Sequence, residues 1–254
     1  KGKGEVEHHV SFLFHPVNAL ISMLFGAPPE WWREAMGVAG EESVWLPDHV
    51  VMALLVVVTI AVLLGVARRR LSLDKPSTLQ QVLEVLVASL RNMCNDVIGH
   101  HAGARFVPFI AALTFFIFVS NFFGLIFFLQ PPTANTSTTF ALSITAFLFY
   151  NIVAVGHHGA IGWLKHFAGP VWWLAPLMLP VEIISHLARV LSLALRLFGN
   201  IFGEHTASGI FFAMVPFVIP WAMMGLGIVG TTIQTFIFIM LTSVYISEAV
   251  AEEH

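Results

Sequence analysis

The chain has 254 residues, of which 57% are hydrophobic and only 11% are Asp, Glu, Lys or Arg. This composition is typical of a protein that crosses the membrane several times and excludes an ordinary soluble domain. The formal net charge is −3 and the basic residues are scattered, which argues against a nucleic-acid partner. Cys94 is the only cysteine, so an internal disulfide and cysteine-based zinc or iron–sulfur sites are excluded as well.

The first predicted membrane helix runs from Asp48 to Val66 and is followed by Arg68, Arg69 and Arg70. Because positively charged loops stay on the cytoplasmic or matrix side, this arginine triplet places the end of the helix inside. Residues 1–47 are then expected outside, as an N-terminal extramembrane or interfacial segment. Residues 48–254 are expected to form a single membrane helical bundle.

Residues 75–99 predict one amphipathic helix that does not cross the membrane. Ser77 and Gln80 are placed as a capping box at its start. Apolar residues recur with helical spacing on one face, at Leu79, Val82, Leu83, Leu86, Leu90, Met93 and Val97. The other face carries Gln81, Glu84, Arg91, Asn95 and Asp96. We expect this helix to lie flat on the inner surface or to pack on the bundle.

Residues 106–164 contain no Asp, Glu, Lys or Arg and are long enough for two further spans. Pro131 and Pro132 lie in the segment 130–139 and predict an outer turn between them. The segment 157–170 is expected to be the loop that returns the chain to the inside, where Lys165 agrees with the topology that Arg105 also indicates.

The last two predicted helices run from about Pro176 to residue 205 and from about Pro220 to Val250. Each exceeds the roughly 20 residues that cross a bilayer, so they should be strongly tilted, kinked or laid along the membrane plane. The sequence therefore predicts an all-α polytopic membrane protein with about five membrane helices and one amphipathic surface helix, the last two membrane helices forming a long tilted hairpin. Its N-terminus is expected outside and its C-terminus inside.

Polar residues of the segment 180–204 share one face of the predicted helix. On a helical wheel they fall within a stripe of roughly 120°, while Leu, Val, Ile and Phe occupy the opposite side. The stripe contains Glu182, Ser185, His186, Arg189, Ser192, Arg196 and Asn200. It predicts a narrow polar surface. One alternative is that its members only satisfy one another, with Glu182 pairing with His186 or Arg189 as glue within the bundle.

Arg196 is the residue of this stripe that most needs an explanation. A central arginine costs roughly 2.5–3.5 kcal/mol on membrane-insertion scales, and ionisable residues inside the membrane are functional by default. Arg189 lies two turns away and Glu182 four turns away, so Arg196 has no evident counter-ion in this chain. We therefore expect a carboxylic acid from another chain to approach Arg196. Because the guanidinium stays charged, it would favour loss of the proton from that carboxylic acid.

Other residues of the last two helices suggest two separate polar patches. Gly199 and Gly203 would let a neighbouring helix approach beside Arg196, although ordinary helix packing explains them equally well. Glu204 and His205 point away from the arginine, with His205 on the opposite side of the helix. On the final helix a second face is shared by Gly227, Gly230 and Gln234. Polar patches on opposite sides of one barrier suggest two half-channels.

The stretch LALRLFGN at residues 193–200 resembles the signature helix of subunit a of the rotary F-type ATP synthase. The resemblance extends from about Asp48 to the end of the chain and also includes the segments STLQQVLEVLV, FVPFI, SNFFGL, PPTANTSTT and IQTFIFIMLTSVYISEA. It implies a non-catalytic stator subunit, without a cofactor, that passes protons through two half-channels. The implied partners are a ring of c subunits, each with a membrane carboxylate, peripheral-stalk b-type subunits and the lipid bilayer.

The resemblance also implies roles for individual residues. Arg196 matches the arginine that separates the half-channels, and Gln234 matches the glutamine that faces it. Further matching positions are Asn200, Glu182, Arg189 and Ser192. His205 matches a position that is Glu or His in the family, whereas Gly227 stands where some members carry its partner, so the adjacent Glu204 competes for the relay role. Titratable His186, Glu204 and His205 favour protons over sodium.

Other classes of function stay open at this point. In a stand-alone ion or proton transporter or channel, Glu182, His186 and Arg196 would line the pore. A membrane haem protein would use some of the twelve histidines as axial ligands. Weak zinc candidates are His157, His158 and His166, with His8, His9 and His15 near the N-terminus. The expected compartment is a bacterial inner membrane, with an organelle inner membrane as the alternative.

Overall fold

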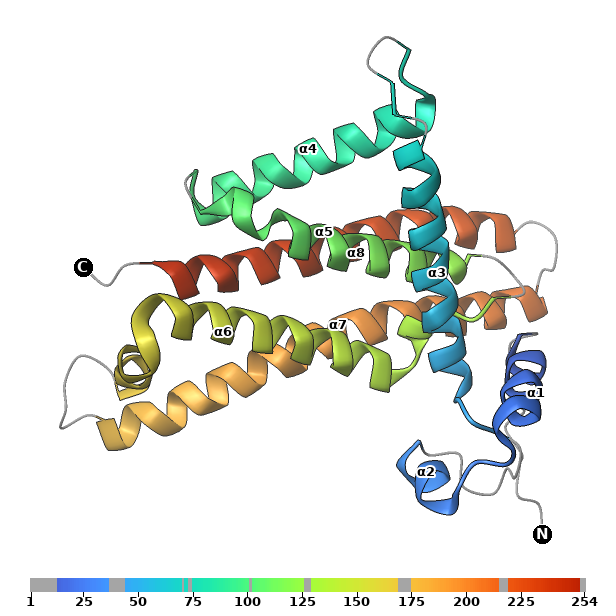
Figure 1. The fold of residues 1–254 in the computed structure, drawn as a ribbon, viewed down its shortest axis with the longest axis horizontal. Coiled ribbons are helices and arrows are strands. Elements are labelled where there is room, and N and C mark those ends of the chain that lie inside the picture. Colours follow the sequence, from blue (N-terminus) through green and yellow to red (C-terminus); the bar gives the residue numbers. More distant parts are fainter. Residues whose placement is uncertain are drawn as a thin grey trace.

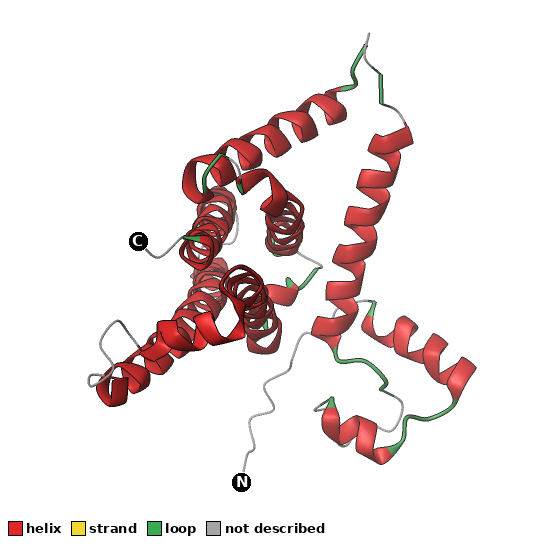
Figure 2. Cartoon of the chain, turned by 60° about the vertical axis from the view of Figure 1, so that its left-hand side comes forward, coloured by secondary structure: helices red, strands yellow, loops and turns green. Residues whose placement is uncertain are grey.

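The protein is represented by a computed structural model that describes residues 13–36, 44–69, 71–72, 75–100, 102–125, 129–168, 175–214 and 219–251. Every regular element within these ranges is helical (Figure 1 and Figure 2). The α-helices are α1 (Phe14–Phe25), α2 (Glu30–Ala35), α3 (Asp48–Arg69), α4 (Thr78–Ile98), α5 (Gly103–Phe123), α6 (Thr136–Ala168), α7 (Ala175–Met214) and α8 (Ile219–Val250), and a short 3₁₀ helix, η1, covers Pro132–Ala134. The predicted all-α class is confirmed.

Five of these helices are long and apolar enough to cross a membrane, which confirms the predicted number of spans. The candidate spans are Asp48–Arg69, Gly103–Phe123, Thr136–Gly159, Pro176–Phe211 and Ala222–Val250. Large hydrophobic side chains are exposed along them, for example Val58 on α3 and Leu187 on α7. A surface of this kind is stable in contact with lipid tails and not with water.

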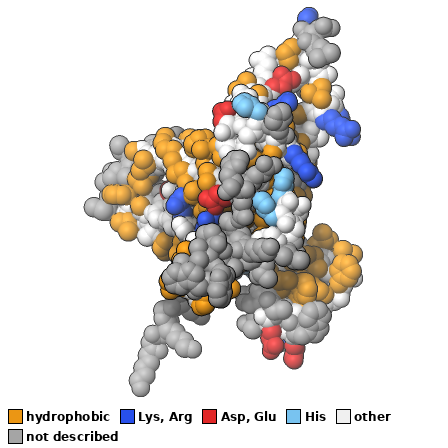
Figure 3. Space-filling view, turned by 90° about the vertical axis from the view of Figure 1, so that its left-hand side faces the viewer, with side chains coloured by type: hydrophobic (Ala, Val, Ile, Leu, Met, Phe, Trp, Pro, Cys, Tyr) orange, Lys and Arg blue, Asp and Glu red, His pale blue; other side chains and the backbone are white. Residues whose placement is uncertain are grey.

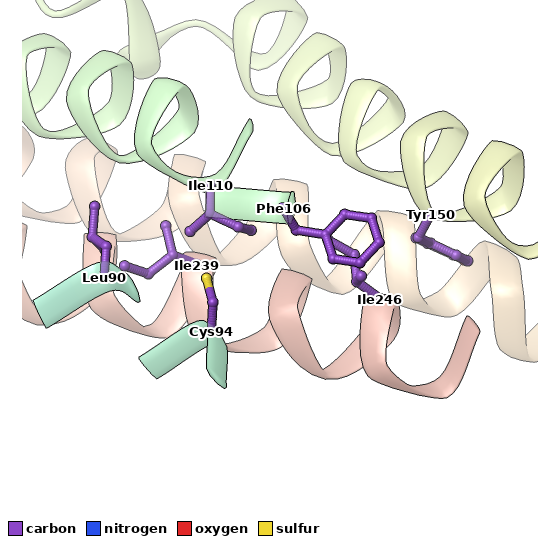
Figure 4. Packing of buried hydrophobic residues seen from close by; sticks show 7 residues of the cluster. All are labelled: Leu90, Cys94, Phe106, Ile110, Tyr150, Ile239 and Ile246. Carbon is purple, nitrogen blue, oxygen red and sulfur yellow. The ribbon is translucent and has the colours of Figure 1, made fainter. Parts of the chain in front are cut away.

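Helix α4 packs against the bundle, the second of the two placements that its sequence allowed. Figure 4 shows its Leu90 and Cys94 meeting side chains from α5, α6 and α8 in one buried cluster. The cluster consists of Leu90, Cys94, Phe106, Ile110, Tyr150, Ile239 and Ile246. Burial of these apolar groups, each worth about 1.5–3 kcal/mol when complete, fixes α4 across α5 and α8.

The predicted capping box of α4 is only half formed. The Ser77 hydroxyl accepts a hydrogen bond from the backbone N–H of Gln80 at 3.3 Å, as expected for an N-cap. The Gln80 side chain does not return this bond, because its amide binds the backbone of Ser72 and the carboxylate of Glu84 instead. Gln80 therefore ties the preceding loop to the helix.

Helix α6 differs from the sequence prediction at both ends. The outer turn ends at Asn135 instead of residue 139, because the threonines and serine that follow continue into the helix. The inner segment predicted as a loop is helical to Ala168 and is interrupted only by a kink at Gly159, whose φ of 72° lies in the left-handed region that favours glycine. The kink redirects the helix before its end at Ala168, and residues 169–174 lie outside the described residues.

Helices α7 and α8 form the predicted long hairpin. Figure 1 shows the two helices running along the longest dimension of the molecule, at a steep angle to α3. Helix α7 has 40 residues and continues to Met214, beyond the predicted end near residue 205, because Glu204 and His205 lie within regular helix and do not cap it. If α3 runs along the membrane normal, a hairpin so inclined to it is strongly tilted in the bilayer.

Candidate functional site

The polar stripe predicted for α7 is divided in the structure among three surroundings. Its first part, with Glu182, His186 and Arg189, lines a cavity of about 260 Å³. Helix α6 contributes Tyr150 and the end of α8 contributes Tyr245 and Glu248 to the same cavity. Figure 3 faces this end of the molecule and shows acidic, basic and histidine side chains close to one another among hydrophobic ones.

A chain of hydrogen-bonding groups runs through this cavity. The Tyr150 hydroxyl lies 2.8 Å from Nδ1 of His186, and Nε2 of His186 lies 3.4 Å from Oε1 of Glu182. The expected alternative of a Glu182–His186 pair is therefore observed. His186 lies between a phenol and a carboxylate, so it has neighbours on both ring nitrogens with which it can exchange a proton.

Arg189 is paired across the hairpin with Glu248, a residue for which the sequence predicted no role. Its Nη1 donates a hydrogen bond to Oε2 of Glu248, and its guanidinium carbon lies 5.0 Å from the centre of the Tyr245 ring. Of the two partners expected for Glu182, the structure shows His186, while Arg189 pairs with Glu248. The available signal was the position of Glu248 as the first charge after the charge-free part of the last helix.

The second part of the stripe is exposed on the outer face of α7. Arg196 is exposed there, and it has no hydrogen bond or ion pair with any residue that the structure describes. Ser192, Gly199 and Gly203 are exposed on the same face, and a Cβ added at either glycine would meet open space. The sequence prediction of an arginine without a counter-ion, beside a surface that another helix can approach, thus agrees with the described residues.

The third part of the polar stripe on α7, around Asn200 and the neighbouring Glu204, faces α8. A Cβ added at Gly227 would collide with the carboxylate of Glu204, and one added at Gly230 would lie 3.8 Å from the side-chain oxygen of Asn200. One further turn along each antiparallel helix brings Arg196 level with Gln234. The Gln234 side chain is buried, whereas Arg196 is exposed, so the two occupy the same level with different surroundings. The His205 side chain lies outside the described residues.

Several buried polar atoms around this region have no hydrogen-bond partner within the described part of the chain. They are Asn200 Nδ2, Gln234 Nε2, Thr231 Oγ1, Ser120 Oγ, Asn121 Nδ2 and Ser143 Oγ. The oxygen of the Asn121 side chain does accept a bond, at 2.7 Å from the Thr133 hydroxyl. Ser120, Asn121 and Ser143, which interrupt the charge-free segment 106–164, were the available sequence signal for the polar groups on α5 and α6.

The histidines proposed for zinc give no metal site among the described side chains, where no group of three His, Cys, Asp or Glu could hold an ion. His157 and His158 have ring centres 6.3 Å apart. The side chain of His166, and all of His8 and His9, lie outside the described residues.

Comparison with known proteins gives a consistent result. Residues 49–247 match the family model described as ATP synthase A chain. The chain is 45% identical over 207 residues to ATP synthase subunit a of Geobacter sp. (strain M21), covering 82% of this chain and 89% of that protein. It is 46% identical over 207 residues to ATP synthase subunit a of Trichlorobacter lovleyi, again covering 82% and 89%. For ATP synthase subunit a of Geobacter sulfurreducens the identity is 41% with the same two coverages.

Proposed function

Since the chain belongs to the ATP synthase A chain family, we propose that it is the stator subunit that passes protons to and from the carboxylates of a rotating c ring. The subunit makes and breaks no covalent bond of the nucleotide; it provides two aqueous half-channels that Arg196 separates. Family membership does not favour a stand-alone transporter or channel.

The exposed position of Arg196 on α7 is the observation that carries this function. An arginine left against lipid is costly, so the assembled protein must supply a compensating group. A ring carboxylate about 4 Å away gains about 4 kcal/mol at an effective dielectric of about 20. The small residues Ser192, Gly199 and Gly203 leave room for the ring helix that carries it.

The cavity around Glu182 and His186 supports the inner half-channel. It lies at the C-terminal end of α8. The topology that follows from the arginines after α3 places this end of α8 on the inner side of the membrane. Within the cavity, Tyr150, His186 and Glu182 form a line of groups that can pass a proton toward Ser192 and the ring. Arg189, held by Glu248 beside this line, keeps a fixed positive charge in the cavity wall.

The outer half-channel is assigned to the polar groups between α5, α6, α7 and α8. Buried polar atoms in proteins are bonded to other groups or to water, so the six unpartnered atoms described above support a hydrated path. Glu204 is the proposed relay on this path, because its carboxylate occupies the space that Gly227 leaves. Asn200 and Gln234 continue the path toward Arg196.

The remaining assignments follow from the family and the topology. Titratable His186 and Glu204 favour protons as the transported ion. The named relatives are bacterial, which supports a bacterial inner membrane over an organelle membrane. Peripheral-stalk b-type subunits are the proposed further partners. Residues 48–254 are proposed as the membrane bundle and residues 1–47 as an extramembrane or interfacial segment.

The experiment that tests this function replaces Arg196 with alanine in the whole complex. Arg196→Ala should abolish proton-driven ATP synthesis in reconstituted liposomes while the complex still assembles, because the arginine contacts no described residue of its own chain. Leu195→Ala, at an adjacent exposed position, is the matched control and should retain synthesis. Normal synthesis by Arg196→Ala would disprove the proposal.

A further inference from the structure

The N-terminal helix α1 is attached firmly to the start of the first membrane span. Its Asn18 is only 3% exposed and accepts hydrogen bonds from the backbone N–H groups of Trp45 and Leu46, both at 2.8 Å. The Asn18 side-chain NH₂ also donates to the carbonyl of Leu46 at 3.0 Å. Because Leu46 lies two residues before Asp48, where α3 begins, α1 is held beside the start of this span (Figure 1).

Helix α1 is apolar but too short to cross the bilayer. Its 12 residues extend about 18 Å, compared with a hydrocarbon core about 30 Å thick. Residues 8–29 contain no Asp, Glu, Lys or Arg. The last two turns of α1 nevertheless expose large hydrophobic side chains: Leu20 is 60% exposed, Met23 86%, Leu24 68% and Phe25 73%. In water, such a surface would be unfavourable by several kcal/mol.

Tryptophans and charges are arranged around α1 as they are at a membrane interface. The Trp32 and Trp45 rings lie 6.3 Å apart, and the indole N–H of Trp45 donates to the carbonyl of Gly26, directly after α1. Helix α2 follows with an exposed Glu34 and an ion pair between Glu30 and Arg33 at 4.0 Å. Tryptophan is enriched at the headgroup level, where an apolar ring and a polar group can both be accommodated.

We propose that the apolar end of α1 inserts into the boundary between headgroups and acyl chains of the leaflet in which α3 begins. The partner is the lipid surface itself, because α1 is hydrogen-bonded to the residues directly before a membrane span and its exposed end offers no charge for a protein partner to recognise. Helix α2 then lies on the aqueous side. In Figure 3 hydrophobic side chains gather over this lower part of the molecule. The segment precedes residues 49–247, which match the family, so it anchors this chain independently of the ring contact.

The test places a nitroxide spin label at position 23 by Met23→Cys in the complete ATP synthase, reconstituted in phosphatidylethanolamine and phosphatidylglycerol vesicles. The matched control is Glu34→Cys, at an exposed position of α2, and the native Cys94 is fully buried and does not compete for the label. Relaxation of each label by oxygen, which concentrates in lipid, is compared with relaxation by a neutral nickel chelate, which stays in water.

We expect oxygen to relax the label at position 23 more strongly than the nickel chelate, with the opposite order at position 34. Equal nickel accessibility at the two positions would place α1 in water and contradict the proposal. A label at position 23 that is shielded from both reagents would show a protein partner on this surface and would also overturn it.

Discussion

At the scale of single residues, Arg196 and Glu204 lie on the same helix about two turns apart but meet different surroundings. Arg196 is exposed on the outer face of α7, whereas the carboxylate of Glu204 is directed at Gly227 of α8. A fixed positive charge on the outer face of α7 and a titratable group facing the bundle are the two elements that the proposed half-channel, ending at a barrier, requires. Because Gly227 has no side chain, there is room for the carboxylate of Glu204.

The importance of that space can be tested with Gly227→Ala. The added methyl group collides with the Glu204 carboxylate, and overpacking of this kind costs about 1–3 kcal/mol. If the whole penalty falls on proton transfer, proton-driven ATP synthesis slows by about 5-fold to about 160-fold. The measurement is the synthesis rate in reconstituted vesicles.

Gly225→Ala is the control for that variant, because an added Cβ at Gly225 has no neighbour within 4 Å. It should leave the rate unchanged. Equal rates for the two variants would show that Glu204 is not the relay on this face, and that His205 must be considered in its place.

The sequence predicted which residues of α7 are polar but not which neighbours they meet. A helical wheel treats Glu182, Arg189 and Arg196 as one stripe, because it assumes a single environment along the helix. In the structure, Arg189 forms an ion pair with Glu248 at the end of α8. The polar stripe begins in the cavity and continues onto the exposed face of α7. Such partners from distant parts of the chain depend on how α7 and α8 cross, which the periodicity of one helix does not contain.

At the scale of elements, α4 shows how one helix is fixed to the bundle without crossing the membrane. Leu90 and Cys94 contact the cluster formed by α5, α6 and α8, while Val82 and Val85 on the same helix are exposed. The amphipathic pattern predicted the helix correctly but its apolar side only in part, because Leu90 is buried whereas Val82 on the same predicted face is exposed. The pattern does not show whether the helix packs on lipid or on the protein bundle, because either surface can bury apolar residues.

The buried position of Cys94 gives a prediction for thiol chemistry. Burial raises the pKa of the Cys94 thiol, with a smaller opposing effect from a hydrogen bond with Ser243. Since the thiolate is the reactive form, alkylation should be at least about tenfold slower than at an exposed cysteine and should accelerate only above the usual pH range of thiols. A mass-spectrometric time course on the intact complex between pH 7 and pH 10 measures this.

The comparison is a cysteine introduced by Val85→Cys, which is 67% exposed on the same helix. Alkylation of Cys94 as fast as of this cysteine would show that α4 does not stay packed on the bundle.

At the scale of the whole molecule, the helices separate two polar regions. The cavity lined by Glu182 and His186 opens where α8 ends, and the buried groups without a partner among the described residues lie around the region in which Asn200 and Gly230 face each other. Composition and the lengths of the apolar segments predicted the five spans and the hairpin correctly, because these depend on the thickness of the bilayer. The kink at Gly159 was missed, because one glycine in a helical pattern does not show whether the helix ends or bends.

The contact proposed between the exposed face of α7 around Arg196 and the ring is tested by disulfide formation with a c subunit. Gly199→Cys places a thiol one turn from Arg196 in open space, and Ala194→Cys places one at a position of the same helix that is 0% exposed. Each variant is combined with a cysteine beside the ring carboxylate and oxidised in native membranes. We expect a cross-linked product for Gly199→Cys and none for Ala194→Cys. A product for Ala194→Cys alone, or for neither variant, would contradict it.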